Sequence, residues 1–269
     1  MGLSVSNLTN LVASPIKENF HFSLIGDIHG HQSAYQKLCS NSKYSLQIGD
    51  LCIESNTLNK LSHPDYHKFF GGNHDDYSLT PSLESDWMNG RKNLIKKSEI
   101  VYNLQNFKDH SVGQWGLYSI PEVVSEDFSN SLFFIRGAWS IDRYNRINNF
   151  NWFYEEELNI NQSNLALDEY CRIKPNFVVS HTCPVEVMSF LELRMSKGNI
   201  ITTNTGLLLQ NIFENHAPKL WVFGHFHQNK CFVYKGTLFV CLDVKTSLNF
   251  NKKLEIISNS SLFWSYMDI

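Results

Sequence analysis

The sequence predicts an α/β fold in which two mixed sheets pack together and helices flank them. Short apolar runs rich in Val, Ile, Leu and Phe stop at glycine or serine, as central strands of α/β sheets do, and segments of helical periodicity separate them. Between positions 76 and 180, alternating segments indicate the strands of a second sheet. No linker divides the 269 residues, so we expect a single domain over 1–269, with a substrate-selecting insertion at about 78–160.

The first part of the chain has the pattern of a β-α-β unit. A strand over 20–26 stops at Gly26, and HQSAYQKL opens a helix over about 31–40. Strands over 44–48 and 66–71 each end at a glycine. The alternating strands of the second sheet are expected in the segments EIVYNL, GQWGLYSI and SLFFIRGAW. Beyond them we expect helices over 152–159, 163–172, 185–195 and 204–215, and strands over 219–224, 230–234, 237–243 and 253–257.

Five short motifs place a metal-ligating side chain directly after an apolar run. They are GDIHG at 26–30, GD at 49–50, GNHD at 72–75, SHT at 180–182 and GHFH at 224–227. Ligands of such sheets bind at the carboxyl ends of the strands, so residues as far apart as Asp27 and His227 can converge. A lone histidine on an apolar strand is usually a core residue, but five histidines here repeat one pattern. The series therefore predicts a two-metal hydrolytic centre.

The candidate ligands combine two kinds of donor atom. Oxygens come from Asp27, Asp50 and Asn73, and imidazole nitrogens come from His29, His181, His225 and His227. This mixed set suits Mn, Fe, Zn, Co or Ni and disfavours calcium. Two such cations about 3.5–4 Å apart lower the pKa of a bound water and polarise a phosphoryl group. We therefore expect two divalent metal ions as the cofactor, with manganese as the first choice.

The order D-x-H, GD, GNHD, H, GH-x-H over residues 20–243 resembles that of the calcineurin-like metallophosphoesterases. The resemblance implies that family's four-layer α-β-β-α sandwich and hydrolysis of phosphate esters by a hydroxide bound to the dinuclear centre. It also implies the metal assignments: Asp27, His29 and His227 for the first ion, Asn73, His181 and His225 for the second, and Asp50 as the bridge. His74 would serve as general acid on the leaving oxygen, and Asp75 beside it would hold the imidazole.

The later motifs depart from those of one subfamily. GDIHG is shared with protein serine/threonine phosphatases and with dinucleoside-tetraphosphate hydrolases. The phosphatases usually continue with GDYVDRG and RGNHE, whereas this chain has GDLCIES and GGNHD, with Gly71 in place of a phosphate-clamping arginine. Phosphoprotein phosphatase activity is therefore not expected. The segments FIRGAWSIDRY at 134–144 and EEEL at 155–158 are similar to phosphoesterases carried by phages and bacteria.

Substrate contacts are expected in the 78–160 insertion. Phosphate could be clamped by Arg136, Arg143 and Arg146. A base could stack on Trp139, Tyr144 or Trp152. For each of these side chains a structural role is the competing expectation, because large aromatic residues usually belong to the core.

Charge and composition exclude several classes of protein. A net charge of −3 argues against extended nucleic-acid binding, and the dense basic string RKNLIKK at 91–97 is more typical of a solvated face. The N-terminal sequence has neither a secretory signal nor about 18 consecutive apolar residues, so we expect no membrane span and a cytoplasmic location. The six cysteines form no C-x-x-C pair, which predicts reduced, buried thiols.

The leading hypothesis is a metal-dependent phosphoesterase that hydrolyses phosphomonoesters or phosphodiesters of a small or nucleotide-like substrate. A nuclease or a dinucleoside-polyphosphate hydrolase is the alternative within that class. A catalytically silent scaffold with the same fold is the alternative from another class. Its usual sign is missing ligands, and none of the seven candidates is missing from this sequence.

Overall fold

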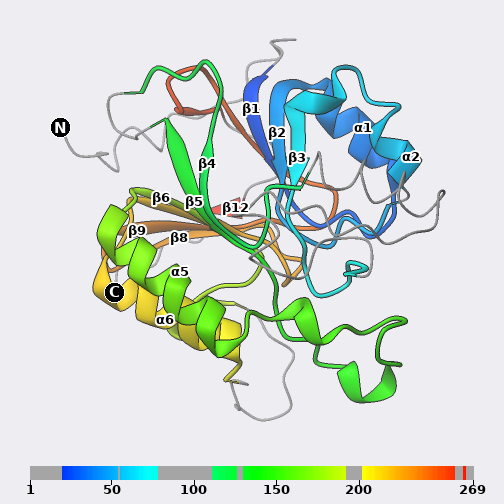
Figure 1. The fold of residues 1–269 in the computed structure, drawn as a ribbon. Helices are drawn as coiled ribbons and strands as arrows, with labels where there is room; N and C mark the ends of the chain where they lie inside the picture. The colour runs from blue at the N-terminus through cyan, green and yellow to red at the C-terminus, as the bar shows by residue number, and fades with distance from the viewer. Residues whose placement is uncertain are drawn as a thin grey trace.

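The computed structural model describes residues 20–53, 55–77, 111–125, 130–191, 202–257 and 263–264. Two sheets face each other, and helices cover the outer face of each, so the layers follow the order helix, sheet, sheet, helix (Figure 1). Both sheets contain parallel and antiparallel pairs of strands. The predicted α/β sandwich of two mixed sheets is therefore confirmed.

The first sheet brings three of the predicted motifs to one edge. Its spatial order is β11 (Ile256–Ile257), β10 (Ser247–Phe250), β1 (Phe20–Ile25), β2 (Ser42–Gln47) and β3 (His67–Phe69). The last three strands are parallel, with Leu24 opposite Leu46 in the register. Their carboxyl ends therefore lie side by side, and the loops with GDIHG, GD and GNHD start there. The outer face of this sheet packs on α1 (Gln32–Ser40) and α2 (Ser55–Leu58).

The second sheet brings the two remaining motifs to its own carboxyl edge. Its spatial order is β12 (Phe263–Trp264), β8 (Lys230–Tyr234), β9 (Thr237–Cys241), β7 (Leu220–Phe223), β6 (Phe177–Ser180), β5 (Ser131–Ile135) and β4 (Trp115–Ser119). The four strands from β9 to β5 are parallel. His181 follows β6 directly, and the GHFH motif follows β7. The outer face packs on α5 (Ile160–Ile173) and α6 (Asn204–Asn215).

Alternation along the central strands builds two separate apolar layers. In β7, Leu220 and Val222 join the core between the sheets, while Trp221 and Phe223 join the cluster beneath α5 and α6. All four side chains are buried. Burying a large apolar side chain stabilises the fold by about 1.5–3 kcal/mol, so both layers hold the strand ends in place.

The predicted helix over 152–159 is wrong. The structure has a single 3₁₀ turn at Tyr154–Glu156, and α5 begins only at Ile160. Asn159 ends the irregular segment because its side chain accepts from the backbone N–H of Gln162, while the Gln162 side chain accepts from the backbone N–H of Asn159. This capping box satisfies donors that a helix N-terminus otherwise leaves free.

Other differences are local. The helix expected over 185–195 begins as a 3₁₀ helix at Glu186–Phe190, and residues 192–195 lie outside the described residues. The segments EIVYNL and RKNLIKK also lie outside them. Strand β10 was not predicted, because SLNF is short and half polar. Of the helices within the described ranges, none has the length and hydropathy needed to cross a bilayer.

The predicted insertion over 78–160 includes part of the second sheet. Within it, β4 and β5 form one side of that sheet. The part of the chain from Gly137 to Leu158 then contains turns, two 3₁₀ turns and an isolated bridge between Asn148 and Trp152 before α5. It is tied to the GNHD loop, because Gly137 N donates to Gly71 O at 2.9 Å. Selection of substrate by this stretch remains a prediction.

Candidate metal centre

The backbone turns sharply where the candidate ligands leave their strands. Four of the seven have left-handed backbone conformations, with φ values of +47° at His29, +55° at Asp50, +68° at His225 and +52° at His227. A residue with a Cβ in that region carries strain of about 1–3 kcal/mol, and such strain gathers at functional sites. The tight turns aim the four side chains back across the strand ends.

Two glycines let these loops pack closely enough for the side chains to meet. A Cβ at Gly49, whose φ is +109°, would run into the His181 ring. A Cβ at Gly72 would run into both the Asp50 carboxylate and that same ring. The glycines in the second and third motifs are therefore required by the close approach of loops from both sheets.

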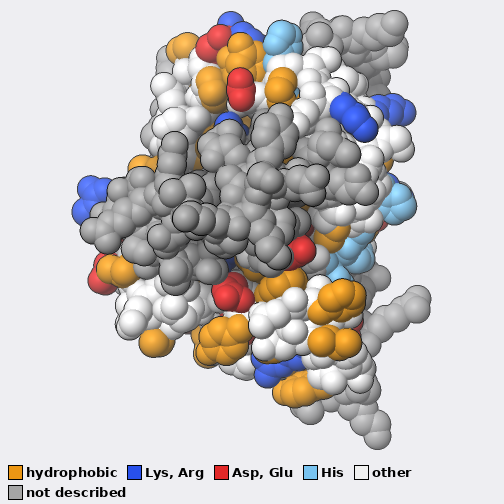
Figure 2. Space-filling model, turned by 45° about the vertical axis from the view of Figure 1, so that its right-hand side comes forward, with side chains coloured by type: hydrophobic (Ala, Val, Ile, Leu, Met, Phe, Trp, Pro, Cys, Tyr) orange, Lys and Arg blue, Asp and Glu red, His pale blue; other side chains and the backbone are white. Residues whose placement is uncertain are grey.

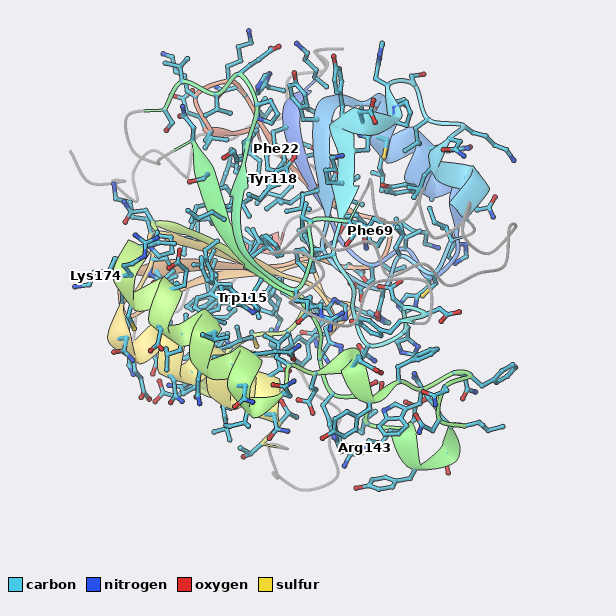
Figure 3. All side chains as sticks on the ribbon, in the orientation of Figure 1. Phe22, Phe69, Trp115, Tyr118, Arg143 and Lys174 are labelled. Atoms are coloured by element: carbon cyan, nitrogen blue, oxygen red, sulfur yellow. The ribbon has the colours of Figure 1, made fainter. Side chains whose placement is uncertain are left out.

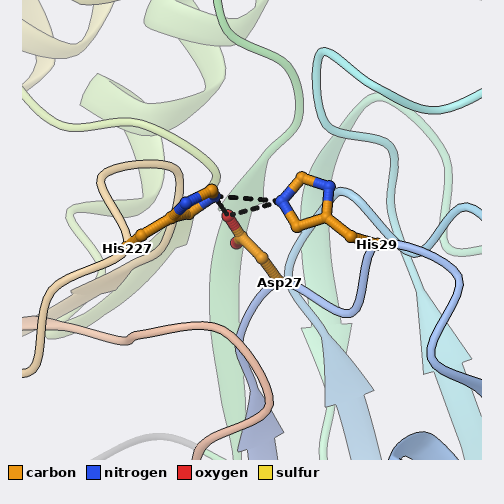
Figure 4. Close-up of side chains that lie close together, drawn as sticks. All are labelled: Asp27, His29 and His227. Atoms are coloured by element: carbon orange, nitrogen blue, oxygen red, sulfur yellow. Dashed lines mark hydrogen bonds and ion pairs between the residues drawn. The ribbon is translucent and has the colours of Figure 1, made fainter.

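The first candidate cluster consists of Asp27, His29 and His227 (Figure 4). The Nε2 atoms of the two histidines lie 2.9 Å apart. Asp27 Oδ2 lies 3.1 Å from His227 Nε2 and 3.8 Å from His29 Nε2. One carboxylate oxygen and two imidazole nitrogens thus point toward a common position, which is the donor set that Mn, Fe or Zn accepts.

The second candidate cluster shares Asp27 with the first and adds Asp50 and His181. His181 Nε2 lies 3.4 Å from Asp50 Oδ1 and 3.1 Å from Asn73 Oδ1. The other Asp50 oxygen lies 3.8 Å from Nε2 of His29 in the first cluster. Asp50 therefore presents one oxygen to each cluster, as expected of a bridging carboxylate.

His225 lies beside the second cluster. Its ring packs edge-to-face on the His181 ring with 5.1 Å between centroids, and its backbone N–H is 3.2 Å from both Asp27 oxygens. Burial, together with the charge of His181, lowers the pKa of His225 to about 3. The ring is therefore neutral, which is the form that binds a metal.

The buried charges at the centre stabilise one another. Burial opposes protonation of His181, but the Asp50 carboxylate outweighs it and raises the His181 pKa to about 9. Burial also opposes ionisation of Asp50, and the His181 charge outweighs that and holds the Asp50 pKa below its ordinary value. Nδ1 of His181 is 2.9 Å from the carbonyl of Ile48, which orients Nε2 toward the cluster. A cation there would take the place of the proton on Nε2.

His74, the predicted general acid, lines the same cavity as Asp50 and Asn73. Its backbone N–H donates to Asp50 Oδ1 at 2.7 Å, and its ring nitrogens lie 3.1 Å from Arg146 Nη2. Burial lowers the pKa of His74, and the charges of Arg146 and His29 lower it further against the opposing effect of Asp50. The ring is thus placed at the cavity with a cationic neighbour.

Asp75 has partners other than the His74 ring that it was expected to hold. Its Oδ2 accepts from Gly72 N and its Oδ1 from Cys52 N, both at 2.8 Å. Burial and the nearby Asp50 charge raise its pKa to about 6. These bonds connect the GNHD loop to the loop after β2, so Asp75 fixes the geometry of two ligand loops.

The three candidate phosphate-clamping arginines lie in different surroundings. Arg136 is buried, with its guanidinium 4.5 Å from the centroid of the Tyr77 ring. Arg143 stacks on Trp139 at 4.6 Å and lies at the lower right of the molecule in Figure 3. Arg146 lines the cavity with His74 and is paired with Asp142 at 2.7 Å. Among these three described side chains, Arg146 is the one positioned to meet a ligand in the cavity.

The cavity over the clusters is about 450 Å³ in volume and is lined by both polar and apolar side chains. The polar ones include Asp50, Asn73, His74, His225 and His227. The apolar ones include Trp139, Ile141, Met188 and Phe226. Figure 2 shows histidine side chains reaching the surface with hydrophobic side chains beside them. Of the aromatic residues considered for stacking, Trp139 lines this cavity.

Two buried residues near the centre were missed by the sequence reasoning. Ser140 and Glu156 are 0% and 2% exposed, and they connect to Asn73 through hydrogen bonds. Both lie in the segments FIRGAWSIDRY and EEEL, but nothing in the local pattern assigns them a partner. Of the six cysteines, four are buried as expected, whereas Cys171 is half-buried and Cys52 is exposed.

Comparison with known proteins adds structural similarities at low sequence identity. No family model and no curated protein matches the sequence. The protein TT1561 of Thermus thermophilus is similar at 12% identity and a TM-score of 0.43, over 85% of this chain and 91% of that one. The phosphopantetheinyl hydrolase of Mycobacterium tuberculosis is similar at 10% identity and a TM-score of 0.40, over 85% and 92%. Because both TM-scores are below 0.5, we base the function on the site alone.

Proposed function

We propose that this protein is a metal-dependent phosphoesterase with two divalent cations at the carboxyl ends of β1, β2, β3, β6 and β7. One observation carries the proposal: two clusters of oxygen and imidazole donors share Asp27, and Asp50 presents an oxygen to each. In the proposed arrangement Asp27, His29 and His227 would hold the first cation, Asn73, His181 and His225 would hold the second, and Asp50 would serve both. Such a cation pair supplies an activated water at neutral pH and polarises the oxygens of a phosphoryl group.

The protein's own groups supply the remaining requirements of ester hydrolysis. The Arg146 side chain lines the cavity, and its guanidinium can bind a phosphoryl oxygen of the substrate. That binding would draw the guanidinium away from the His74 ring. Once Arg146 has moved, the His74 ring can take up a proton from solvent and pass it to the departing oxygen, so that no free alkoxide forms. Both groups line the same cavity as Asp50 and Asn73.

We propose a small or nucleotide-like ester as the substrate. The cavity volume of about 450 Å³ is in the range of sites for small molecules, which run from about 300 to 1,000 Å³. Trp139 and Phe226 in its lining offer flat surfaces for the organic part of the ester. The net charge of −3 disfavours a long nucleic acid as the substrate.

The test is hydrolysis by protein treated with EDTA and then reloaded with Mn²⁺. Three substrates separate the candidates: p-nitrophenyl phosphate, bis(p-nitrophenyl) phosphate and a labelled oligonucleotide. We expect turnover of one or both nitrophenyl esters, no turnover after EDTA treatment, and recovery with manganese. Cleavage of the oligonucleotide alone would favour a nuclease. Silence on all three substrates with two ions bound would contradict the proposal and favour a scaffold.

A further inference from the structure

We propose that Glu156 and Ser140 are positioning residues that fix the side-chain amide of Asn73 with its oxygen toward the second metal position. This inference rests on the proposed function, because it assigns the orientation of one ligand in that centre. The two residues come from the irregular segment between β5 and α5, whereas Asn73 follows β3 in the other sheet. The hydrogen bonds between them join the two sheets at the site.

A chain of hydrogen bonds runs inward from the carboxylate. Ser140 Oγ donates to Glu156 Oε2 at 2.7 Å, and Ser140 N donates to Glu156 Oε1 at 2.9 Å. Asn73 Nδ2 donates to Ser140 Oγ at 3.0 Å. Asn73 Oδ1, at the other end of the amide, lies 3.1 Å from Nε2 of His181. Glu156, Ser140 and Asn73, the three residues that this series of hydrogen bonds starts from, are each at least nine-tenths buried.

The chemistry of the groups gives this chain its direction. An ionised carboxylate can only accept hydrogen bonds, so the Ser140 hydroxyl must donate its one proton to Glu156. The same hydroxyl oxygen can then only accept a hydrogen bond from Asn73. The end of the amide that faces Ser140 must then be the NH₂ group. The two ends of an asparagine amide have nearly the same shape, and only the oxygen is a metal ligand. Without the chain, either end could face the metal position.

Backbone contacts also bring the segment with Ser140 and Glu156 close to the loop that carries Asn73. Gly137 has φ +82°, and a Cβ there would collide with the carbonyl oxygen of Glu156. Its N–H donates to Gly71 O at 2.9 Å, which brings the segment against the loop that carries Asn73. In the same loop, Tyr77 Oη donates to Gly72 O at 2.8 Å. The two residues before Asn73 are therefore each fixed by a hydrogen bond.

The experiment measures binding of Mn²⁺ to full-length protein freed of metal, by calorimetry and by the electron paramagnetic resonance of bound ions. The variants are Ser140→Ala, which removes the middle of the chain, and Glu156→Gln, which keeps its shape. The matched control is Ser23→Ala. Ser23, in β1, is also fully buried, and its hydroxyl donates to Asn249 at 2.7 Å. This control shows the effect of losing a buried Ser–Asn hydrogen bond away from the metals.

We expect both chain variants to weaken one of the two manganese sites by roughly 10–100-fold, the usual effect of removing a hydrogen-bond partner of a ligand. The other site should keep its affinity, and the spin-coupled signal of an ion pair should give way to that of single ions. Ser23→Ala should change neither. If both chain variants bind two ions as tightly as wild type, the inference is overturned. If wild-type protein itself binds fewer than two ions, the proposed metal centre fails instead.

Discussion

Asp50 and His181 lie 3.4 Å apart, Oδ1 to Nε2, although they follow strands of different sheets. The contact places an ionised carboxylate and an imidazole in the buried space where the two sheets come together. The second oxygen of Asp50 faces His29, 3.8 Å away, so one side chain connects both donor clusters. The proposed chemistry depends on this connection more than on any single ligand.

Replacing Asp50 by Asn should remove the bridge while keeping the shape of the side chain. Cation polarisation supplies several kcal/mol of transition-state stabilisation, so kcat/KM should fall by roughly 10²–10³-fold or more. Bound manganese, measured by elemental analysis after dialysis, should fall below two ions per chain. Asp168→Asn is the control, because Asp168 lies on α5, away from the metal centre. Unchanged hydrolysis by Asp50→Asn would refute the bridging role.

Replacing His74 by Asn should separate proton donation from metal binding. General acid catalysis contributes about 10²–10⁴-fold, so kcat should fall by that amount for alkyl phosphates, whose leaving oxygens need a proton. It should fall much less for p-nitrophenyl phosphate, because nitrophenolate is stable as an anion. Manganese content should stay at the wild-type level. An equal loss for both kinds of ester would show that His74 is not the proton donor.

Arg146 and Arg143 form a matched pair for testing the phosphate clamp. Arg146 lines the cavity, whereas Arg143 stacks on Trp139. A hydrogen bond to a charged group is worth about 1.5–3 kcal/mol, so Arg146→Ala should lower kcat/KM by roughly 10–100-fold. Arg143→Ala should change it less than about threefold, as expected for a group outside the cavity. The reverse ranking in steady-state kinetics would move the clamp to Arg143.

Glu156 should make stability depend on pH in a defined direction. Burial raises its pKa in the folded protein above the ordinary value of 4.5, against the lowering effect of bonds from Ser140. The folded state therefore binds this proton more tightly than the unfolded chain does. The resulting stabilisation is complete below pH 4.5 and is lost as the pH rises through the folded-state pKa.

The non-titrating variant Glu156→Gln tests that direction. Its loss in free energy of unfolding relative to wild type should be larger at about pH 4.5 than at about pH 7.5, because wild type has lost the proton's contribution at the higher pH. Urea unfolding of both proteins in EDTA gives the difference at each pH. If the loss in free energy of unfolding instead grew as the pH rose from about 4.5 to about 7.5, the folded state would favour the ionised form of Glu156, contrary to the direction that burial gives.

The sequence was sufficient to predict the layers and the position of the site because both depend on short, local patterns. Runs such as FVVS and LWVF are buried on both faces, and each stops where a polar motif begins. Parallel pairing then brings the ends of β6 and β7 together, with Val179 opposite Val222. The strand ends predicted that these histidines would converge, and the family resemblance assigned His181 and His225 to one ion; the structure places their rings 5.1 Å apart.

The rest depends on contacts between distant segments, which no local pattern specifies. The Asp75 side chain bonds to Cys52 N across two loops instead of to the adjacent imidazole. Glu156 lies in the acidic run EEEL, which resembles a solvated surface, yet its carboxylate is buried because Ser140 supplies two donors. The left-handed backbone at His29 and His227 likewise follows from loop packing.

The most direct test of the central claim is anomalous diffraction at the manganese edge from crystals soaked in Mn²⁺. We predict two peaks about 3.5–4 Å apart, one near Asp27, His29 and His227 and one near Asn73, His181 and His225, with Asp50 between them. A single peak, or none within reach of these side chains, would contradict the dinuclear centre.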